Sequence, residues 1–244
     1  MRVLKLTVSY DGTRFVGWQR QAHGESIQGL LEDALARFEG APVTVNGAGR
    51  TDAGVHALGQ VASVQVTCTH PADELMRGLN AALPPDVRVT ELVEAAADFH
   101  ARFSARSKVY RYQICNAPIV SPFDRAYMWH VPERLDVSAM RAAASAIVGT
   151  HDFAAFRSTG TPNKSTVRTI TRSNLTESAI LTYEITGNGF LRYMVRAIVG
   201  TLVDVGRDRR NPESMAALVE GATRAEAGAT APPHGLFLVR VEYH

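Results

Sequence analysis

The feature that most constrains how this chain can fold is the stretch Asn-Gly-Ala-Gly-Arg-Thr-Asp-Ala-Gly-Val-His at residues 46–56, between two apolar segments with strand-like alternation. Its glycines permit positive φ angles and let other groups approach the main chain closely. Within the stretch, Asp52 follows Arg50 by two residues. An aspartate in such a turn is either a turn former or a reactive group presented to a substrate, and the stretch alone leaves both interpretations open.

Apolar residues recur at strand or helix spacing along the rest of the chain. Ser26 and Asp136 are expected N-caps of helices, and Gly40 an expected helix end. The expected strands are residues 2–10, 43–45, 61–66, 87–92, 109–115, 169–175, 180–186 and 235–243. The expected helices are residues 27–38, 71–83, 137–148 and 190–205, with a short one after residues 211–212.

The order of these elements predicts an α+β fold. Strands come in pairs more often than they alternate with helices, which favours antiparallel layers over a doubly wound parallel sheet. Much the same order occurs twice, so we expect two similar α+β halves, residues 1–105 and 106–244, sharing a mostly antiparallel central sheet flanked by helices. The first half carries Asp52, and the second carries Tyr110 on a strand and Arg196 on a long helix.

The charge distribution points to nucleic acid more clearly than the net charge does. The formal net charge is only +2, which is too small to indicate such a partner. However, cations gather in clusters, two of which are runs without acids, and aromatic residues are interleaved with them. The cations are Arg102, Arg106, Lys108 and Arg111, then Lys164, Arg168 and Arg172, then Arg192 with Arg196, and Arg207 with Arg209 and Arg210; the aromatic residues are Tyr110, Tyr112, Phe190 and Tyr193. This pattern is typical of a surface that binds phosphates and stacks on bases.

Composition restricts the class of protein further. Apolar residues make up 45% of the chain, enough to build a core. The N-terminus alternates like a strand and resembles no signal peptide, and no apolar run approaches transmembrane length. The two cysteines, Cys68 and Cys115, lie far apart in the chain. We therefore expect a reduced, cytoplasmic protein without a membrane partner.

Several common chemistries lack their motifs in this sequence. The dinucleotide fingerprint fails at its third glycine, and no phosphate-binding GxxxxGK[ST] loop, HExxH or GxSxG occurs. Asp52 and His56 are four residues apart, but a metal site needs a further ligand. We therefore expect a carboxylate that acts without metal or nucleotide cofactor, kept ionised by Arg50. From helix geometry alone Arg196 is more typical of a solvated arginine, and Tyr110 is either a strand aromatic or a stacking or proton-handling group.

Taken in order, the motifs resemble those of the bacterial tRNA pseudouridine synthase A family, along the whole chain. The matching segments are residues 10–21, 26–28, 49–56, 99–105, 110–112, 194–200 and 235–238. The resemblance implies an isomerase that converts uridine to pseudouridine at positions 38, 39 and 40 of the tRNA anticodon stem-loop. It also implies a homodimer, no cofactor, and an active-site cleft between the two halves.

The resemblance assigns roles to individual residues. Asp52 matches the catalytic aspartate, which attacks C1′ of the ribose, adds to C6 of uracil or removes a C2′ proton. Arg50 and Arg196 match arginines near it, which favours a functional role for Arg196 over a solvated one. Tyr110 matches the active-site tyrosine beside the target base. Candidate substrate contacts are Leu236 in the uracil pocket, for which a core position is an equal alternative, and Arg14, Arg20, Arg102 and Lys108 on the tRNA.

Two other functions remain open at this point. A tRNA-binding or RNA-chaperone protein on the same scaffold would bind tRNA without turnover. A metal-dependent hydrolase built on Asp52 and His56 would lose its activity with a chelator.

Overall fold

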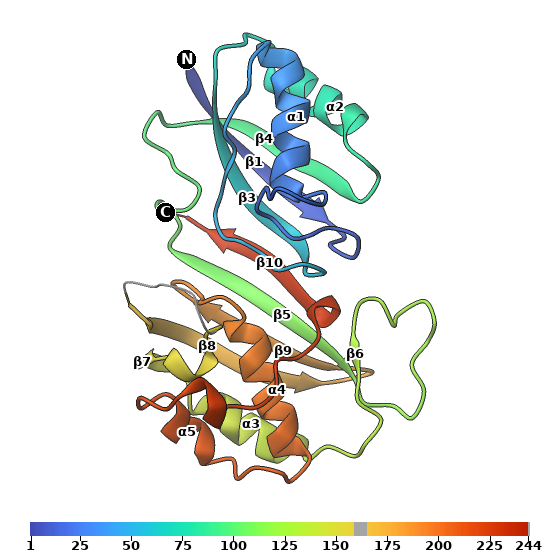
Figure 1. Ribbon diagram of the computed structural model, residues 1–244, viewed down its shortest axis with the longest axis vertical. Helices are drawn as coiled ribbons and strands as arrows, with labels where there is room; N and C mark the ends of the chain where they lie inside the picture. Colours follow the sequence, from blue (N-terminus) through green and yellow to red (C-terminus); the bar gives the residue numbers. More distant parts are fainter. Residues whose placement is uncertain (159–164, 244) are drawn as a thin grey trace. The chain divides into compact units, whose positions relative to one another are not determined.

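In a computed structural model of the chain, which describes residues 1–158 and 165–243, the chain forms two compact units. The first contains Met1–Arg106 together with the residues from Phe237 onward, and the second contains Ser107–Leu236 (Figure 1). The last strand therefore belongs to the first unit, although most of the preceding chain lies in the second. Lys164, in one of the basic runs, lies outside the described residues.

The first unit is a mostly antiparallel sheet with two helices. Strand order is β4-β1-β3-β10; β1 is antiparallel to both β3 and β4, and β10 is parallel to β3. Helix α2 packs against β4, and α1 packs against α2. The elements are β1 (Arg2–Tyr10), α1 (Ile27–Glu39), β2 (Asn46–Gly47), β3 (His56–Val66), α2 (Ala72–Ala82), β4 (Val87–Ala95) and β10 (Leu236–Glu242).

The second unit repeats this layering. Its strand order is β5-β9-β8-β7, with antiparallel neighbours where the pairing is described, and the two-residue β6 pairs with β5. Helix α3 packs against both β8 and α4. The elements are β5 (Ser107–Cys115), β6 (Trp129–His130), α3 (Val137–Ser145), β7 (Gly149–Asp152), β8 (Val167–Glu177), β9 (Leu181–Gly187), α4 (Met194–Gly206) and α5 (Ser214–Leu218), with 3₁₀ turns at Ala154–Phe156, Arg224–Glu226 and Pro233–Gly235.

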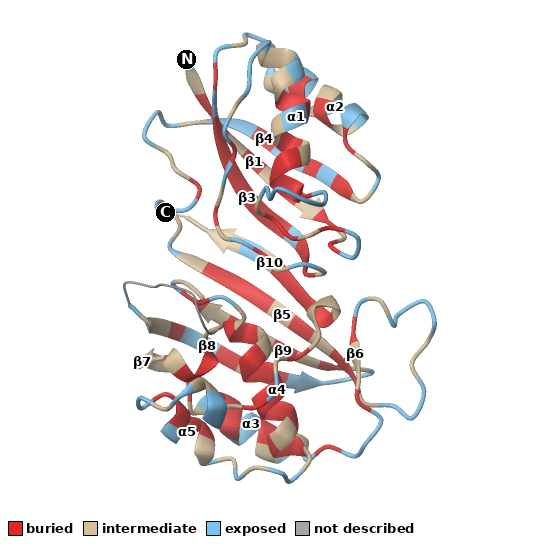
Figure 2. Cartoon of the chain, viewed as in Figure 1, coloured by how far each residue is buried: buried red, intermediate tan, exposed pale blue. Residues whose placement is uncertain are grey.

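The mostly antiparallel sheets with flanking helices confirm the α+β class. Figure 2 shows that the buried residues line the central strands and the helix faces turned to them. Among the described residues, no helix is long and apolar enough to cross a membrane.

Local signals placed the helix ends correctly where a cap residue decides them. The Ser26 hydroxyl accepts a hydrogen bond from the Gly29 N–H at 3.2 Å, and Gly40 closes α1 with φ 71°. A side chain disfavours this left-handed conformation, so glycine is the natural residue there. Asp136 likewise caps α3, its carboxylate accepting from the Ala139 N–H at 2.9 Å.

Several predicted elements have different bounds in the structure, and the strand expected at 61–66 already begins at His56. The strand expected at 43–45 is instead the two-residue β2, Asn46–Gly47. The helix expected from residue 190 begins at Met194. Tyr193 has φ 65°, a left-handed conformation, so the helix cannot extend further toward the N-terminus. The helix expected to reach residue 148 ends at Ser145, and the chain then forms β7, which the sequence pattern did not indicate.

Glu39 ties the end of α1 to the segment that follows β3. Its carboxylate accepts hydrogen bonds from the backbone N–H groups of Thr67, at 2.9 Å, and Cys68, at 2.7 Å. Burial disfavours the charged carboxylate, but these bonds outweigh it and lower the pKa of Glu39 to about 2. The ionised form of this side chain therefore stabilises the first unit.

We predict that Glu39→Gln destabilises the protein at neutral pH and that this deficit shrinks in acid. The folded-state pKa lies below the unfolded value of about 4.3, so the contribution of Glu39 is fully present above pH ~4.3 and is lost as the pH falls toward 2. Urea unfolding of both proteins between pH 2 and 7 measures it. Glu74→Gln, at an exposed acid of α2, is the control and should show no such trend. A deficit for Glu39→Gln that stays constant with pH would contradict this role.

Candidate functional site

Asp52 lies on the loop between β2 and β3, as the sequence predicted. Its side chain is partly buried, and the neighbouring Arg50 is exposed. The Val55 N–H donates to the Asp52 carbonyl oxygen at 3.2 Å, and Gly54 adopts φ 76°. The chain thus makes a tight turn directly after Asp52.

Tyr10, at the end of β1, and the segment that follows it are hydrogen-bonded to this loop. The Trp18 N–H donates to the Thr51 carbonyl oxygen at 3.1 Å. The hydroxyl groups of Tyr10 and Thr51 lie 2.8 Å apart in the core, so one donates to the other. Thr51 is therefore fixed through both its backbone and its side chain, which restricts where its neighbour Asp52 can lie.

Glycines are required where the two segments touch. A Cβ atom on Gly12 would lie 2.0 Å from the Val55 carbonyl oxygen, and one on Gly17 would lie 2.6 Å from that of Thr51. Gly17 also has φ 106°, which disfavours any side chain. The glycine-containing motifs at residues 10–21 and 49–56 are thus the two halves of one contact.

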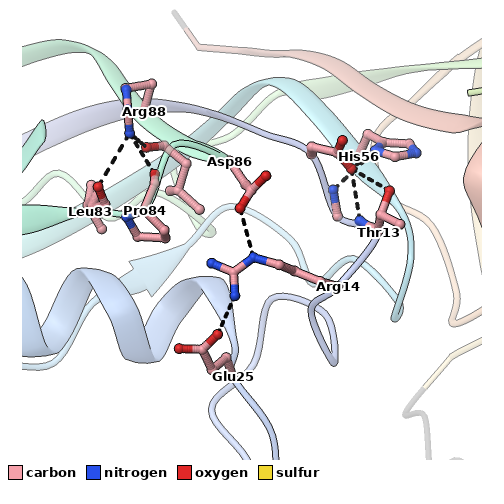
Figure 3. Close-up of polar contacts among 11 residues, drawn as sticks. Thr13, Arg14, Glu25, His56, Leu83, Pro84, Asp86 and Arg88 are labelled. Atoms are coloured by element: carbon pink, nitrogen blue, oxygen red, sulfur yellow. Dashed lines mark hydrogen bonds and ion pairs between the residues drawn. The ribbon is translucent and has the colours of Figure 1, made fainter. Parts of the chain in front are cut away.

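His56 takes part in this contact. Its ring is buried, its Nδ1 accepts the Gly12 N–H at 3.1 Å, and it stacks on Phe237 with ring centres 4.8 Å apart. An Asp11 carboxylate oxygen lies 3.2 Å from the same nitrogen and also accepts the Thr13 N–H at 2.9 Å (Figure 3). Within the part of the chain that the structure describes, no group of three His, Cys, Asp or Glu residues could hold a metal ion.

Two of the predicted tRNA contacts are already paired with acids. Arg14 donates from Nε to Asp86 at 2.7 Å and also forms an ion pair with Glu25 (Figure 3). Arg20 pairs with Glu32 at 2.8 Å and Asp33 at 2.6 Å. These carboxylates offset both positive charges.

In the second unit, Tyr110 and Lys108 lie on β5 and are buried. The Tyr110 ring meets the Phe190 ring edge to face, with centres 5.0 Å apart and planes at 78°. Such a contact fixes an aromatic ring without covering its hydroxyl.

Arg196 is not the solvated arginine that its helical position suggested. Its Nε donates to the Ala231 carbonyl oxygen at 2.8 Å, and the Ala231 N–H donates back to the Arg196 carbonyl oxygen at 3.0 Å. Its guanidinium carbon lies 4.9 Å from the Tyr193 ring centre. A segment that runs along α4 therefore orients this side chain.

That segment can approach α4 because Gly200 has no side chain. A Cβ atom there would lie 1.7 Å from the Ala229 carbonyl oxygen. The Thr201 hydroxyl adds a hydrogen bond from the Gly228 N–H at 2.9 Å. The glycine in the motif at residues 194–200 is thus a packing requirement for placing Arg196.

Leu236 is buried where this segment enters β10. Nearby, the Tyr112 hydroxyl donates to the Pro232 carbonyl oxygen at 2.8 Å, and burial raises the pKa of Tyr112. Burial also lowers the pKa of His234, and the positive charge of Arg196 lowers it further. The sequence assigned no role to Tyr112 or Ala231, although Tyr112 lies in the matching segment 110–112 and is interleaved with cations.

The predicted site residues thus form two groups. Asp52 and Arg50 share one loop of the first unit. Arg14, Arg20 and Arg102 lie elsewhere in that unit. Tyr110, Lys108, Arg196 and Leu236 belong to the second unit. The hollow in the second unit lined by residues 134–137 and 206–208 includes none of them.

Comparisons with known proteins identify the family. The family model described as tRNA pseudouridine synthase matches residues 6–104 and 143–244. The chain is 46% identical over 244 residues to the tRNA pseudouridine synthase A of Pelobacter propionicus, with full coverage of both chains. It is 45% identical over 244 residues to the protein of the same name from Syntrophotalea carbinolica, covering 100% of this chain and 97% of that one.

We predict that Gly12→Ala destabilises the protein by about 2–3 kcal/mol, because its methyl group would meet a backbone oxygen that belongs to the Asp52 loop. Thermal and urea unfolding measure the loss. Gly189→Ala is the matched control, since its Cβ atom would meet only the Arg168 side chain at 3.5 Å, an ordinary contact distance. Equal stabilities of the two variants would show that the segments do not pack as described.

Proposed function

This chain belongs to the tRNA pseudouridine synthase family and is an isomerase that acts on tRNA, and we propose that its targets are the uridines at positions 38, 39 and 40 of the anticodon stem-loop. The observation that carries the proposal is Asp52, a partly buried carboxylate held on a loop whose neighbours fix its position.

The reaction needs a carboxylate and no redox partner. The bond from N1 of uracil to C1′ of the ribose breaks, the base turns over, and a bond from C5 to C1′ forms. The proton on C5 leaves and N1 gains one, so the product has the same atoms as the substrate. Asp52 attacks C1′, adds to C6 or removes a C2′ proton, and each role needs it ionised.

We assign the remaining residues around this step. Arg50 supplies positive charge close to the carboxylate in the chain, which favours its ionised form. By its match to the family motif, Arg196 is proposed as the second catalytic arginine. The bonds from Arg196 to Ala231 orient that guanidinium in advance, so less ordering is needed when the substrate binds. Tyr110 lies beside the target base and Leu236 lines its pocket.

The target base lies inside stacked RNA, so it must be flipped out before it can react. Lys108 and Arg102 are proposed to hold the RNA around it. Arg14 and Arg20 are proposed as further contacts, but a phosphate there has to replace the carboxylates that they already bind. We also propose that the protein is a homodimer and works in the cytoplasm, where its tRNA substrate is found.

We predict that Asp52→Asn lowers the rate of pseudouridine formation by at least about 10³-fold, while the Kd for tRNA changes by less than about threefold. The amide keeps the shape of the side chain and removes its charge. Single-turnover assays with unmodified tRNA, run with chelator and no added cofactor, give the rate, and filter binding gives the Kd.

Asp73→Asn makes the same change at an exposed aspartate of α2, and it should keep full activity. If Asp52→Asn were as active as the wild type, Asp52 would not be the catalytic carboxylate. If the wild type bound tRNA but formed no product, the chain would be an RNA-binding protein on a synthase scaffold. Activity lost only with chelator would indicate a metal-dependent enzyme.

A further inference from the structure

The turn at residues 99–106, which follows β4 and is called here the Phe103 turn, displays an aromatic ring to solvent. Phe103 is 77% exposed, which is unusual for a phenylalanine. Arg102 and Arg106, on the same turn, are exposed as well. A phenylalanine flanked by exposed cations is suited to bind a partner that has both a flat apolar face and negative charge.

The Phe103 turn is held rigidly from within. The His100 Nδ1 accepts the Arg102 N–H at 3.1 Å, and the Ser104 N–H donates to the His100 carbonyl oxygen at 2.9 Å. The His100 ring lies 4.4 Å from the Phe103 ring, centre to centre, and tilted by 38°. Phe103 is therefore set in place before any partner arrives, which lowers the entropy lost on binding.

The same turn is anchored to the base of the Asp52 loop. Ala101 is fully buried, its N–H donates to the Ser63 hydroxyl at 3.0 Å, and its carbonyl oxygen accepts from the Tyr243 hydroxyl at 2.7 Å. Ala101 shares a small core cluster with Ala48 and Val61. Ala48 lies two residues before Arg50, so the Phe103 turn and the Asp52 loop are both joined to this cluster.

Charge around the Phe103 turn favours an anionic partner. Arg50, Arg102 and Arg106 are exposed, and Asp98 is the only acid between residues 95 and 111. Nearby, Glu242 is paired with Arg240. A second copy of this chain would bring the same cations to a symmetric contact, which opposes self-association through this surface.

We propose that Phe103 stacks on an unpaired base of the tRNA substrate next to the target uridine, with Arg102 and Arg106 contacting the adjoining phosphates. This inference rests on the proposed function and specifies how that function holds its substrate. Aromatic side chains take up splayed bases in this way because every base offers an apolar face, and neighbouring arginines bind the backbone between them.

The test compares Phe103→Leu with Phe123→Leu, which makes the same change at a phenylalanine of the second unit that is 87% exposed. Leucine keeps apolar bulk and removes the flat ring. We expect Phe103→Leu to raise both the Kd and the KM for tRNA by about 5- to 100-fold, with kcat within about twofold. Phe103→Trp should restore both constants, and Phe123→Leu should match the wild type.

Salt titrations of tRNA binding test the phosphate contacts. Arg102→Gln should reduce the slope of log affinity against log salt by about one, because one phosphate contact is lost. Arg14→Gln should reduce it by less, since Asp86 and Glu25 already offset that charge.

The outcomes separate this inference from the proposed function. A wild type without pseudouridine synthesis would overturn the function. An active wild type whose Kd and KM are unchanged in a folded Phe103→Leu would overturn the stacking role alone. A change in oligomeric state with Phe103→Leu, measured by sedimentation, and an unchanged Kd for tRNA would make this surface an interface between copies and would also overturn it.

Discussion

The close packing of two backbone segments is the constraint on which the rest of the first unit depends. The segment after β1 lies under the Asp52 loop, and the absence of side chains at Gly12 and Gly17 is what lets the two backbones approach. Once they meet, Thr51 is fixed through its backbone and its hydroxyl. Asp52 is next to this fixed residue, so a flexible-looking, glycine-containing stretch becomes a rigid support for a carboxylate.

In the second unit a glycine likewise allows a close backbone contact, and there the contact positions a positively charged side chain. Gly200 allows a backbone segment to lie on α4, and Ala231 in that segment binds Arg196 through both backbone and side chain. In the first unit such a contact fixes the residue next to Asp52, and in the second it positions the segment that binds Arg196. The Phe103 turn is connected to the first of these contacts, because Ala101 belongs to the same core cluster as Ala48, which precedes the Asp52 loop.

Local signals in the sequence predicted local structure well. Ser26, Gly40 and Asp136 end their helices as expected because a cap depends on a few adjacent residues. The start of α4 was missed because the left-handed conformation of Tyr193 has no sequence signature. The ion pair of Arg14 with Asp86 joins residues that are 72 positions apart. Contacts at such separation are set by the fold, so neither this ion pair nor the bond of Arg196 to Ala231 could be predicted.

The central claim is that this supported carboxylate isomerises uridine in the anticodon stem-loop. The most direct measurement is to incubate the purified protein, without cofactor, with an unmodified tRNA transcript that carries uridine at positions 38, 39 and 40, and to map pseudouridine along the whole RNA. We expect pseudouridine at one or more of these positions and at no other uridine. Product elsewhere in the tRNA, or tRNA bound without product, would contradict the claim.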